Sequence, residues 1–303
     1  MDLPQRLQDL KQRVEVAYAR ADAAAGGRIG VVRQALNGFA LEHSGQAAAS
    51  MAYYTLLSLF PLLLLLTVLG SLFVDTQQVR TVILEALSQI LPPSLILDRM
   101  MEVVDSVLAA RAEVSILGVL VLMWSASGAF TTLTYNVDRA WSRRRRSSPV
   151  KARLIGLLMI VLLYFLLLVV LVASPLLAVL YGRPLLFLAA FGVDDVVVTW
   201  LPRAVAAVVT FLALANVYRW VPRPFGPWRA CLMAGLLAAL ALQALNLGFR
   251  WFLLARLGRY ELIYGSLATI TLVMLWIYLS ASVVFLGAHL AAAMADRRDE
   301  PRA

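Results

Sequence analysis

Six long apolar stretches divide the chain, and polar segments separate them. Each stretch holds about 20 or more mostly apolar residues, which as a helix cross the ~30 Å hydrocarbon core of a bilayer. The runs are continuous rather than alternating, and they are much longer than the ~10 residues of a barrel strand. The pattern therefore predicts an all-α, polytopic membrane protein, a bundle of six transmembrane helices with amphipathic interfacial helices. The stretches cover residues 47–74, 114–135, 154–181, 198–218, 230–254 and 265–292.

The polar segments predict how the chain is organised. Residues 1–45 carry leucines at helical spacing with charged residues between them, which predicts a cytoplasmic amphipathic segment. Residues 46–294 form the six-span domain, and residues 295–303 form a cytoplasmic tail. The largest insertion, 76–111, contains two amphipathic helical patterns broken by a Pro-Pro pair. We expect this hairpin on the outer face, either as a lid on the spans or as a gate or partner-docking lobe.

Polar side chains inside the stretches are where function is expected, because burying them in hydrocarbon is costly. They recur at helical spacing in the first, second and fifth stretches, and in the first they lead to a proline. The candidates for lining a solute cavity are Tyr53, Tyr54, Ser58, Pro61, Ser125, Asn136, Gln243, Asn246 and Arg250. The same stripes are extended by Gln46, Ser50, Thr132 and Tyr135.

Two interpretations of these stripes are open. Hydroxyl and amide side chains can bond across helices, each contributing only ~0.6 kcal/mol. Alternatively, the first, second, fifth and sixth spans wall a hydrophilic cavity, with Gln243, Asn246 and Arg250 on the wall opposite the tyrosines. Arg250 lies about 31 Å along a helix from Arg229, near the predicted outer interface. There it either extends to lipid headgroups or binds a phosphate or carboxylate.

Basic residues orient the predicted bundle. The chain has 27 Lys and Arg against 18 Asp and Glu, a formal net charge of +9. Nineteen of the 27 lie in residues 1–46, 136–153, 219–229 and after 292. The positive-inside rule places these segments, and with them both termini, in the cytoplasm. The excess charge then faces anionic headgroups, so membrane lipids rather than nucleic acid are the expected partners.

Catalytic and metal-binding patterns are absent from the sequence. It has two histidines and one cysteine, and no HExxH, paired-cysteine, Walker A or dinucleotide-type glycine motif. No carboxylate lies in the central part of any apolar stretch, so the sequence shows no intramembrane ion relay. We therefore expect no catalytic residue, no metal and no cofactor, and we expect a protein that is not an enzyme.

Five short motifs, in order along the chain, resemble the YihY/BrkB family of bacterial inner-membrane proteins. They are residues 47–61 (AAASMAYYTLLSLFP), 124–130 (WSASGAF), 218–222 (YRWVP), 264–267 (YGSL) and 275–280 (LWIYLS). The resemblance covers about residues 30–292 and implies a multi-pass protein of the bacterial inner membrane with six spans. It also implies a transporter or exporter of lipid-like or envelope molecules, in a family linked to resistance to host killing.

One position departs from the pattern of that family. Its members commonly carry an acidic residue after the last Gly-Ala pair, where this chain has His289. The family also carries an old ribonuclease label. RNA cleavage needs metal-binding carboxylates or a histidine acid–base pair in a water-filled site. The predicted cytoplasmic segments offer neither, so we do not expect this activity.

The sequence thus favours a transporter or exporter of a small polar or lipid-like solute. The alternative is a non-transporting scaffold or envelope-assembly factor that docks a partner through residues 76–111. A solvated cavity reaching the middle of the bilayer would favour transport. A closed interior with paired polar side chains would favour the scaffold.

Overall fold

The structure is a computed structural model of the whole chain. It describes residues 22, 24, 26–70, 102, 105–106, 116–141, 150, 154, 195–222, 225–264 and 268–299. Every regular element within these residues is a helix, which confirms the all-α prediction. The helices in this part of the chain are α2 (Arg28–Leu41), α3 (Ser44–Gly70), α6 (Ile116–Ala140), α9 (Asp195–Trp220), α10 (Trp228–Tyr264) and α11 (Ala268–Asp299).

Five of the six predicted stretches coincide with described helices. These are α3, α6, α9, α10 and α11, for the first, second, fourth, fifth and sixth stretches. The third stretch, 154–181, lies outside the described residues except for its first residue. The predicted hairpin 76–111 also lies outside them, apart from three residues, as do residues 1–21 of the segment 1–45. The lid, gate and docking interpretations of that hairpin therefore stay predictions.

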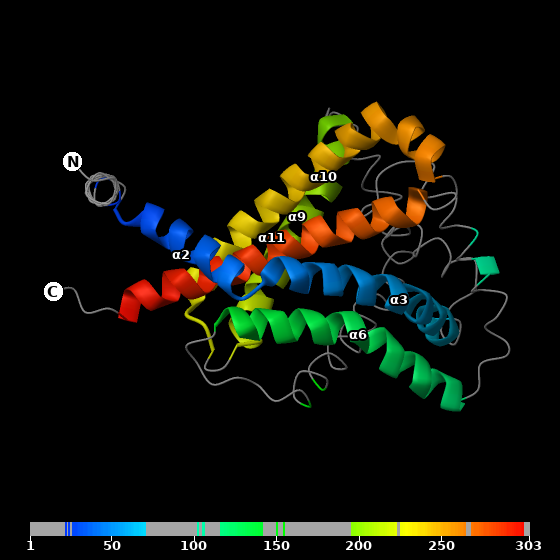
Figure 1. Cartoon of the computed structure of the whole chain (residues 1–303), viewed down its shortest axis with the longest axis horizontal. Coiled ribbons are helices and arrows are strands. Elements are labelled where there is room, and N and C mark those ends of the chain that lie inside the picture. Colours follow the sequence, from blue (N-terminus) through cyan, green and yellow to red (C-terminus); the bar gives the residue numbers. More distant parts are fainter. Residues whose placement is uncertain are drawn as a thin grey trace, which may run out of the picture.

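The helices form two pairs joined by α11. Across the view in Figure 1, α10, α11, α3 and α6 lie in that order, with α9 against α10. The closest packed pairs are α3 with α6, and α10 with both α9 and α11. The helix α11 contacts each of the other five, and α2 lies along its C-terminal part. This arrangement makes α11 the central helix of the described bundle.

A tight turn joins α2 to α3. The backbone N–H groups of Glu42 and His43 donate to the carbonyls of Gly38 and Ala40, at 3.0 and 3.1 Å, and so end α2. His43 then has a φ of 52°, the left-handed conformation that non-glycine residues seldom adopt. Ser44 begins α3 directly afterwards. The turn brings α2 against α11 while α3 runs on into the bundle.

Small residues allow close packing where α9, α10 and α11 meet. A Cβ at Gly235 would lie 3.0 Å from the backbone of Ala215, so only glycine lets α10 approach α9 this closely. Tyr218 is fully buried there, and its hydroxyl donates to the carbonyl of Val284 at 2.8 Å. The single cysteine, Cys231, lies in the same buried cluster.

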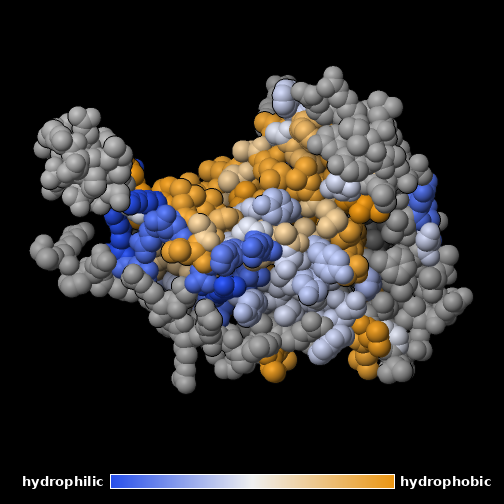
Figure 2. Space-filling model, in the orientation of Figure 1, coloured by the Kyte–Doolittle hydropathy of each residue, from blue (hydrophilic) through white to orange (hydrophobic). Residues whose placement is uncertain are grey.

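Large apolar side chains cover the outside of the bundle. In Figure 2 they form a continuous hydrophobic surface over α10, whereas a large group of strongly hydrophilic residues lies at the end where α2 lies. In the described part, one stretch of α10, Trp228–Leu253, and one of α11, Ile270–Arg297, are long and apolar enough to cross a membrane. Exposed apolar surface of this kind marks a region that contacts an apolar environment or a partner.

Candidate functional site

A polar cavity of about 540 Å³ lies between α3 and α6. Ala47 is its one aliphatic lining residue among those described. The other residues carry hydroxyl, amide, imidazole or guanidinium groups. They are His43, Gln46, Ser50, Tyr54, Thr131, Thr132, Tyr135, Asn136 and Arg139. Figure 2 shows the corresponding pale patch of polar residues over these two helices.

Helical spacing explains why these residues face one another. On α3 they recur every three or four residues, and on α6 they do the same, so each set lies on one face of its helix. Two contacts fix the register of the antiparallel pair. Arg139 Nε donates to Glu42 Oε2 at 2.6 Å near one end. Ser58 Oγ donates to the carbonyl of Ser125 at 3.1 Å further along.

Much of the hydrogen-bonding capacity of the lining is unused. Thr131, Thr132 and Asn136 each donate to a carbonyl one turn earlier in α6, at 2.7 to 2.9 Å. Five other lining side chains make no hydrogen bond with any residue in the described ranges. They are His43, Gln46, Ser50, Tyr54 and Tyr135. Their donors and acceptors are therefore available to a molecule in the cavity.

The cavity is an open groove that runs along α3, and most of its polar lining is exposed, with Tyr54 at 46% and Tyr135 at 44%. Along α3, Tyr54 lies ten residues beyond Ser44, or about 15 Å from the start of the helix. One turn further, Ser58 is 5% exposed, and a Cβ at Gly128 would lie 3.2 Å from its Oγ. This close approach of α6 to α3 closes the inner end of the cavity.

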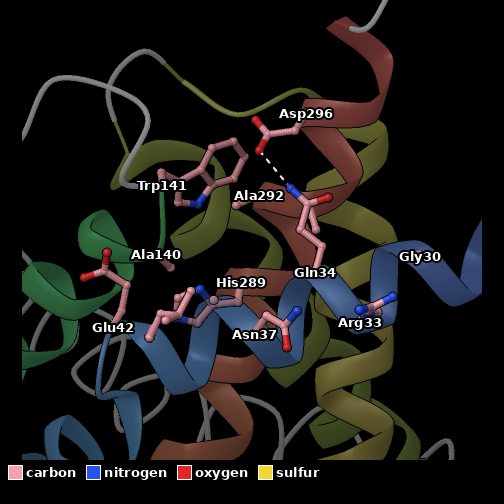
Figure 3. A pocket seen from close by; sticks show the side chains of 13 residues that line it. Gly30, Arg33, Gln34, Asn37, Glu42, Ala140, Trp141, His289, Ala292 and Asp296 are labelled. Carbon is pink, nitrogen blue, oxygen red and sulfur yellow. Dashed lines mark hydrogen bonds between the residues drawn. The ribbon is translucent and has the colours of Figure 1, made fainter. Parts of the chain in front are cut away.

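A second cavity, of about 400 Å³, lies beneath α2 (Figure 3). Residues of α2 form one side, the end of α6 contributes Trp141, and α11 supplies the rest. Gln34 Nε2 donates to Asp296 Oδ2 at 3.1 Å across it. The lining residues are Gly30, Arg33, Gln34, Asn37, Gly38, Leu41, Glu42, Ala140, Trp141, His289, Ala292, Ala293 and Asp296.

Two polar pairs lie between the cavities. Glu42 lines the cavity beneath α2 and Arg139 lines the one between α3 and α6, so their ion pair joins the two linings. His289 is 4% exposed, and its Nε2 is 2.8 Å from Ser44 Oγ, at the start of α3.

The structure brings together some of the candidate residues on α3 and α6. Tyr54 and Asn136 line the polar cavity. The ring of Tyr53 packs edge-on against that of Tyr54, with the ring centroids 5.6 Å apart, but Tyr53 is not part of the lining. Ser58 and Ser125 are bonded to each other beyond the inner end, as the interhelical interpretation expects. Pro61 lies inside α3, half-buried.

The candidates on α10 lie elsewhere. Asn246 Oδ1 accepts a hydrogen bond from Trp276 Nε1 of α11 at 3.0 Å, and Gln243 and Arg250 are exposed. Because α11 separates α10 from α3 (Figure 1), these three residues do not face Tyr54. The wall opposite α3 is formed by α6 rather than by the fifth stretch.

Some residues of the site were not predicted from the sequence. Arg139 was counted only as a basic residue of a cytoplasmic loop, although it follows Asn136 at helical spacing. The pairing of His289 with Ser44 was not expected either. The only sequence signal for it was a single histidine in an otherwise apolar stretch.

Comparison with known proteins decides the family. The family described as virulence factor BrkB matches residues 35–303, which is most of the chain. The chain belongs to the BrkB family. This confirms the YihY/BrkB resemblance of its motifs.

Several BrkB relatives are similar over most of this chain. A UPF0761 membrane protein of Alkalilimnicola ehrlichii is 30% identical over 83% of this chain and 55% of its own length. A UPF0761 membrane protein of Ralstonia nicotianae is 28% identical over 86% of this chain and 59% of its own length. The chain thus spans a little over half the length of these curated relatives. No solved structure matches the chain.

Proposed function

We propose that the protein is a multi-pass transporter or exporter of the bacterial inner membrane that carries a small polar or lipid-like solute. The cavity between α3 and α6 is its solute site. The observation that carries this proposal is an open polar groove that runs about 15 Å along α3 in an otherwise apolar bundle, with unbonded hydroxyl and amide groups along it. The proposal includes no catalytic step.

The membrane orientation follows from the ends of the helices. The start of α3, the ends of α6, α9 and α11, and the start of α10 all lie on the side where α2 lies (Figure 1). Basic residues sit at these ends, among them Arg139, Arg219, Arg229 and Arg297. By the positive-inside rule we assign this side, and with it both termini, to the cytoplasm. The proposal assigns the remaining span to the third predicted stretch, 154–181, which lies outside the described residues apart from residue 154.

The cost of burying polar groups supports transport over a purely structural role. In a packed structural bundle, polar side chains at membrane depth pair with one another, because an unpaired group costs free energy. Ser58 and Asn246 are paired in this way. Gln46, Ser50 and Tyr54 are exposed in the groove and not paired with described residues, which suits a wall that faces water or solute rather than lipid.

Flux through proteoliposomes tests the proposal. The full chain is reconstituted, and uptake of a panel of labelled polar solutes is measured for the wild type and for Asn136→Ala. Loss of one hydrogen-bonding side chain costs ~1 kcal/mol, so flux of the transported solute is expected to fall about fivefold.

Asn216→Ala is the matched control. Asn216 also donates to a carbonyl one turn earlier at 2.8 Å, but on the outside of α9, so its flux should equal that of the wild type. Absence of flux for every solute, with Asn136→Ala and Tyr54→Phe still complementing a deletion strain, would overturn the proposal.

A further inference from the structure

We propose that the cavity between α3 and α6 binds a neutral, hydroxyl-rich group, such as a sugar or polyol, in preference to an anion or a cation. The inference rests on the proposed function only in taking this cavity as the solute site. It follows from the charge of the lining, from its hydrogen-bonding groups and from its two aromatic rings.

Apart from the imidazole of His43, the described lining offers no basic or carboxylate side chain without a partner. Its one guanidinium, that of Arg139, is held by the carboxylate of Glu42 at 2.6 Å. No carboxylate lines the cavity among the residues that the structure describes. An anion would therefore have to displace Glu42, and a cation would find no counter-ion. Either one would bring a charge into an apolar bundle without compensation, which is costly.

The hydrogen-bonding groups suit hydroxyls instead. The amides of Gln46 and Asn136 and the hydroxyls of Ser50, Tyr54 and Tyr135 each combine a donor with an acceptor. A sugar hydroxyl likewise donates and accepts, so a neutral polyol can satisfy such a wall without leaving a buried group unpaired. Sites built from groups of this kind discriminate strongly against ligands that cannot return the hydrogen bonds.

Two tyrosines complete the match. Tyr54 comes from α3 and Tyr135 from α6, and Tyr53 packs edge-on against Tyr54 and so limits its movement. A tyrosine presents an apolar ring and a polar hydroxyl together, as the C–H face and the hydroxyls of a sugar ring require. The cavity volume of about 540 Å³ is in the usual range for small-molecule sites and accommodates a sugar.

Binding of probes that have similar structures but different charges tests the inference. The full-length protein is studied by equilibrium dialysis with D-glucose, D-glucosamine and D-glucose 6-phosphate, and with myo-inositol and its monophosphate. Each neutral probe is expected to bind about tenfold or more tightly than its charged counterparts. Asn136→Ala and Tyr54→Phe should weaken neutral binding about fivefold, whereas Asn216→Ala should not change it.

Glu42→Gln gives the sharper test, because it leaves the guanidinium of Arg139 without its partner. This variant should gain binding of D-glucose 6-phosphate by about tenfold and keep its affinity for D-glucose. The gain should disappear in Glu42→Gln/Arg139→Gln. A Glu42→Gln variant whose selectivity equals that of the wild type would contradict the role assigned to the ion pair.

A second arm separates a free sugar from a lipid headgroup. The dialysis is repeated in nanodiscs that contain either phosphatidylglycerol alone or phosphatidylglycerol with monoglucosyl diacylglycerol. Competition by the glucosyl lipid indicates a headgroup, and unchanged binding indicates a free solute. Charged probes that bind as tightly as neutral ones, or no binding of any neutral probe in either form, would overturn the inference.

Flux distinguishes this inference from the proposed function. Transport of only charged solutes would leave the proposed function standing and remove the inference. Binding of neutral probes without flux of any solute would support the inference and contradict the proposed function.

Discussion

At the scale of single residues, the contact between Gly38 and His289 shows how closely α2 packs on α11. A Cβ at Gly38 would lie 2.9 Å from His289 Nδ1. The His289 ring cannot move away freely, because Ser44 Oγ is hydrogen-bonded to its Nε2 and the ring of Phe39 packs edge-on, with the ring centroids 6.1 Å apart. Gly38→Ala should therefore lower the free energy of unfolding by about 1–3 kcal/mol, measured by thermal unfolding in detergent.

Gly248→Ala is the control for this prediction. Nothing lies within 4 Å of a Cβ at Gly248, and alanine favours a helix over glycine by about 1 kcal/mol. This variant should unfold at the wild-type temperature or above it. Equal destabilisation of both variants would show that the contact with His289 is not the cause.

Residue-level features differ in how far the sequence predicts them. Tyr54 and Asn136 were identified because helical spacing is a local property that the sequence shows directly. The partner of His289 could not be predicted in this way, since Ser44 lies 245 residues away in the chain. A pairing over that distance depends on which helices are neighbours, and the polar stripes carry no such information.

At the scale of elements, α2 is tied to the end of α11 by an ion pair that pH should control. Arg297 Nη2 donates to Asp22 Oδ2 at 2.8 Å, and Arg297 Nη1 donates to the carbonyl of Gly27. The backbone N–H of Gly30, which donates to Asp22, and then Arg297 lower the pKa of the Asp22 carboxyl below its ordinary value.

A lowered folded-state pKa means that this contact stabilises the docked segment above the ordinary carboxyl pKa. The stabilisation is lost as the pH falls from about 4 through the lowered pKa. Hydrogen exchange of residues 26–41 should therefore accelerate on acidification in the wild type. In Asp22→Asn it should be faster at neutral pH and less dependent on pH, and an unchanged profile in that variant would contradict the assignment.

Helix starts were predictable from the sequence to within three residues, whereas α10 ends ten residues beyond its predicted stretch. Helix neighbours were not predictable. The apolar runs determine where α3, α6, α9, α10 and α11 lie because each run is long and continuous. The sequence also shows directly that Gln243, Asn246 and Arg250 lie on one face of their helix. The expected position of this face opposite Tyr54 was wrong for the described helices, because α10 packs on α9 and α11.

At the scale of the whole molecule, the proposed bilayer should cover the outer face of α10. In a Cys231→Ser background, Leu247→Cys should resist a membrane-impermeant maleimide, although residue 247 is 73% exposed in the structure. Leu41→Cys, at a position that is 78% exposed beside the charged end, should react when the cytoplasmic side is accessible. Fast aqueous labelling of Leu247→Cys would contradict the proposed membrane position. Serine at 231 can keep the hydrogen bond that Cys231 Sγ donates to the Tyr218 carbonyl.

The central position of α11 also has a consequence for biogenesis. It is the last described helix in chain order, yet it contacts all five others. While the chain is being synthesised, α3, α6, α9 and α10 must stay in the translocon or among lipids, and α2 on the cytoplasmic side, without their common partner. His289 can shield Ser44, and Trp276 can bond Asn246, only after this last insertion. Chains that stop before Ala268 should therefore be degraded quickly, because membrane quality control recognises unpaired polar groups.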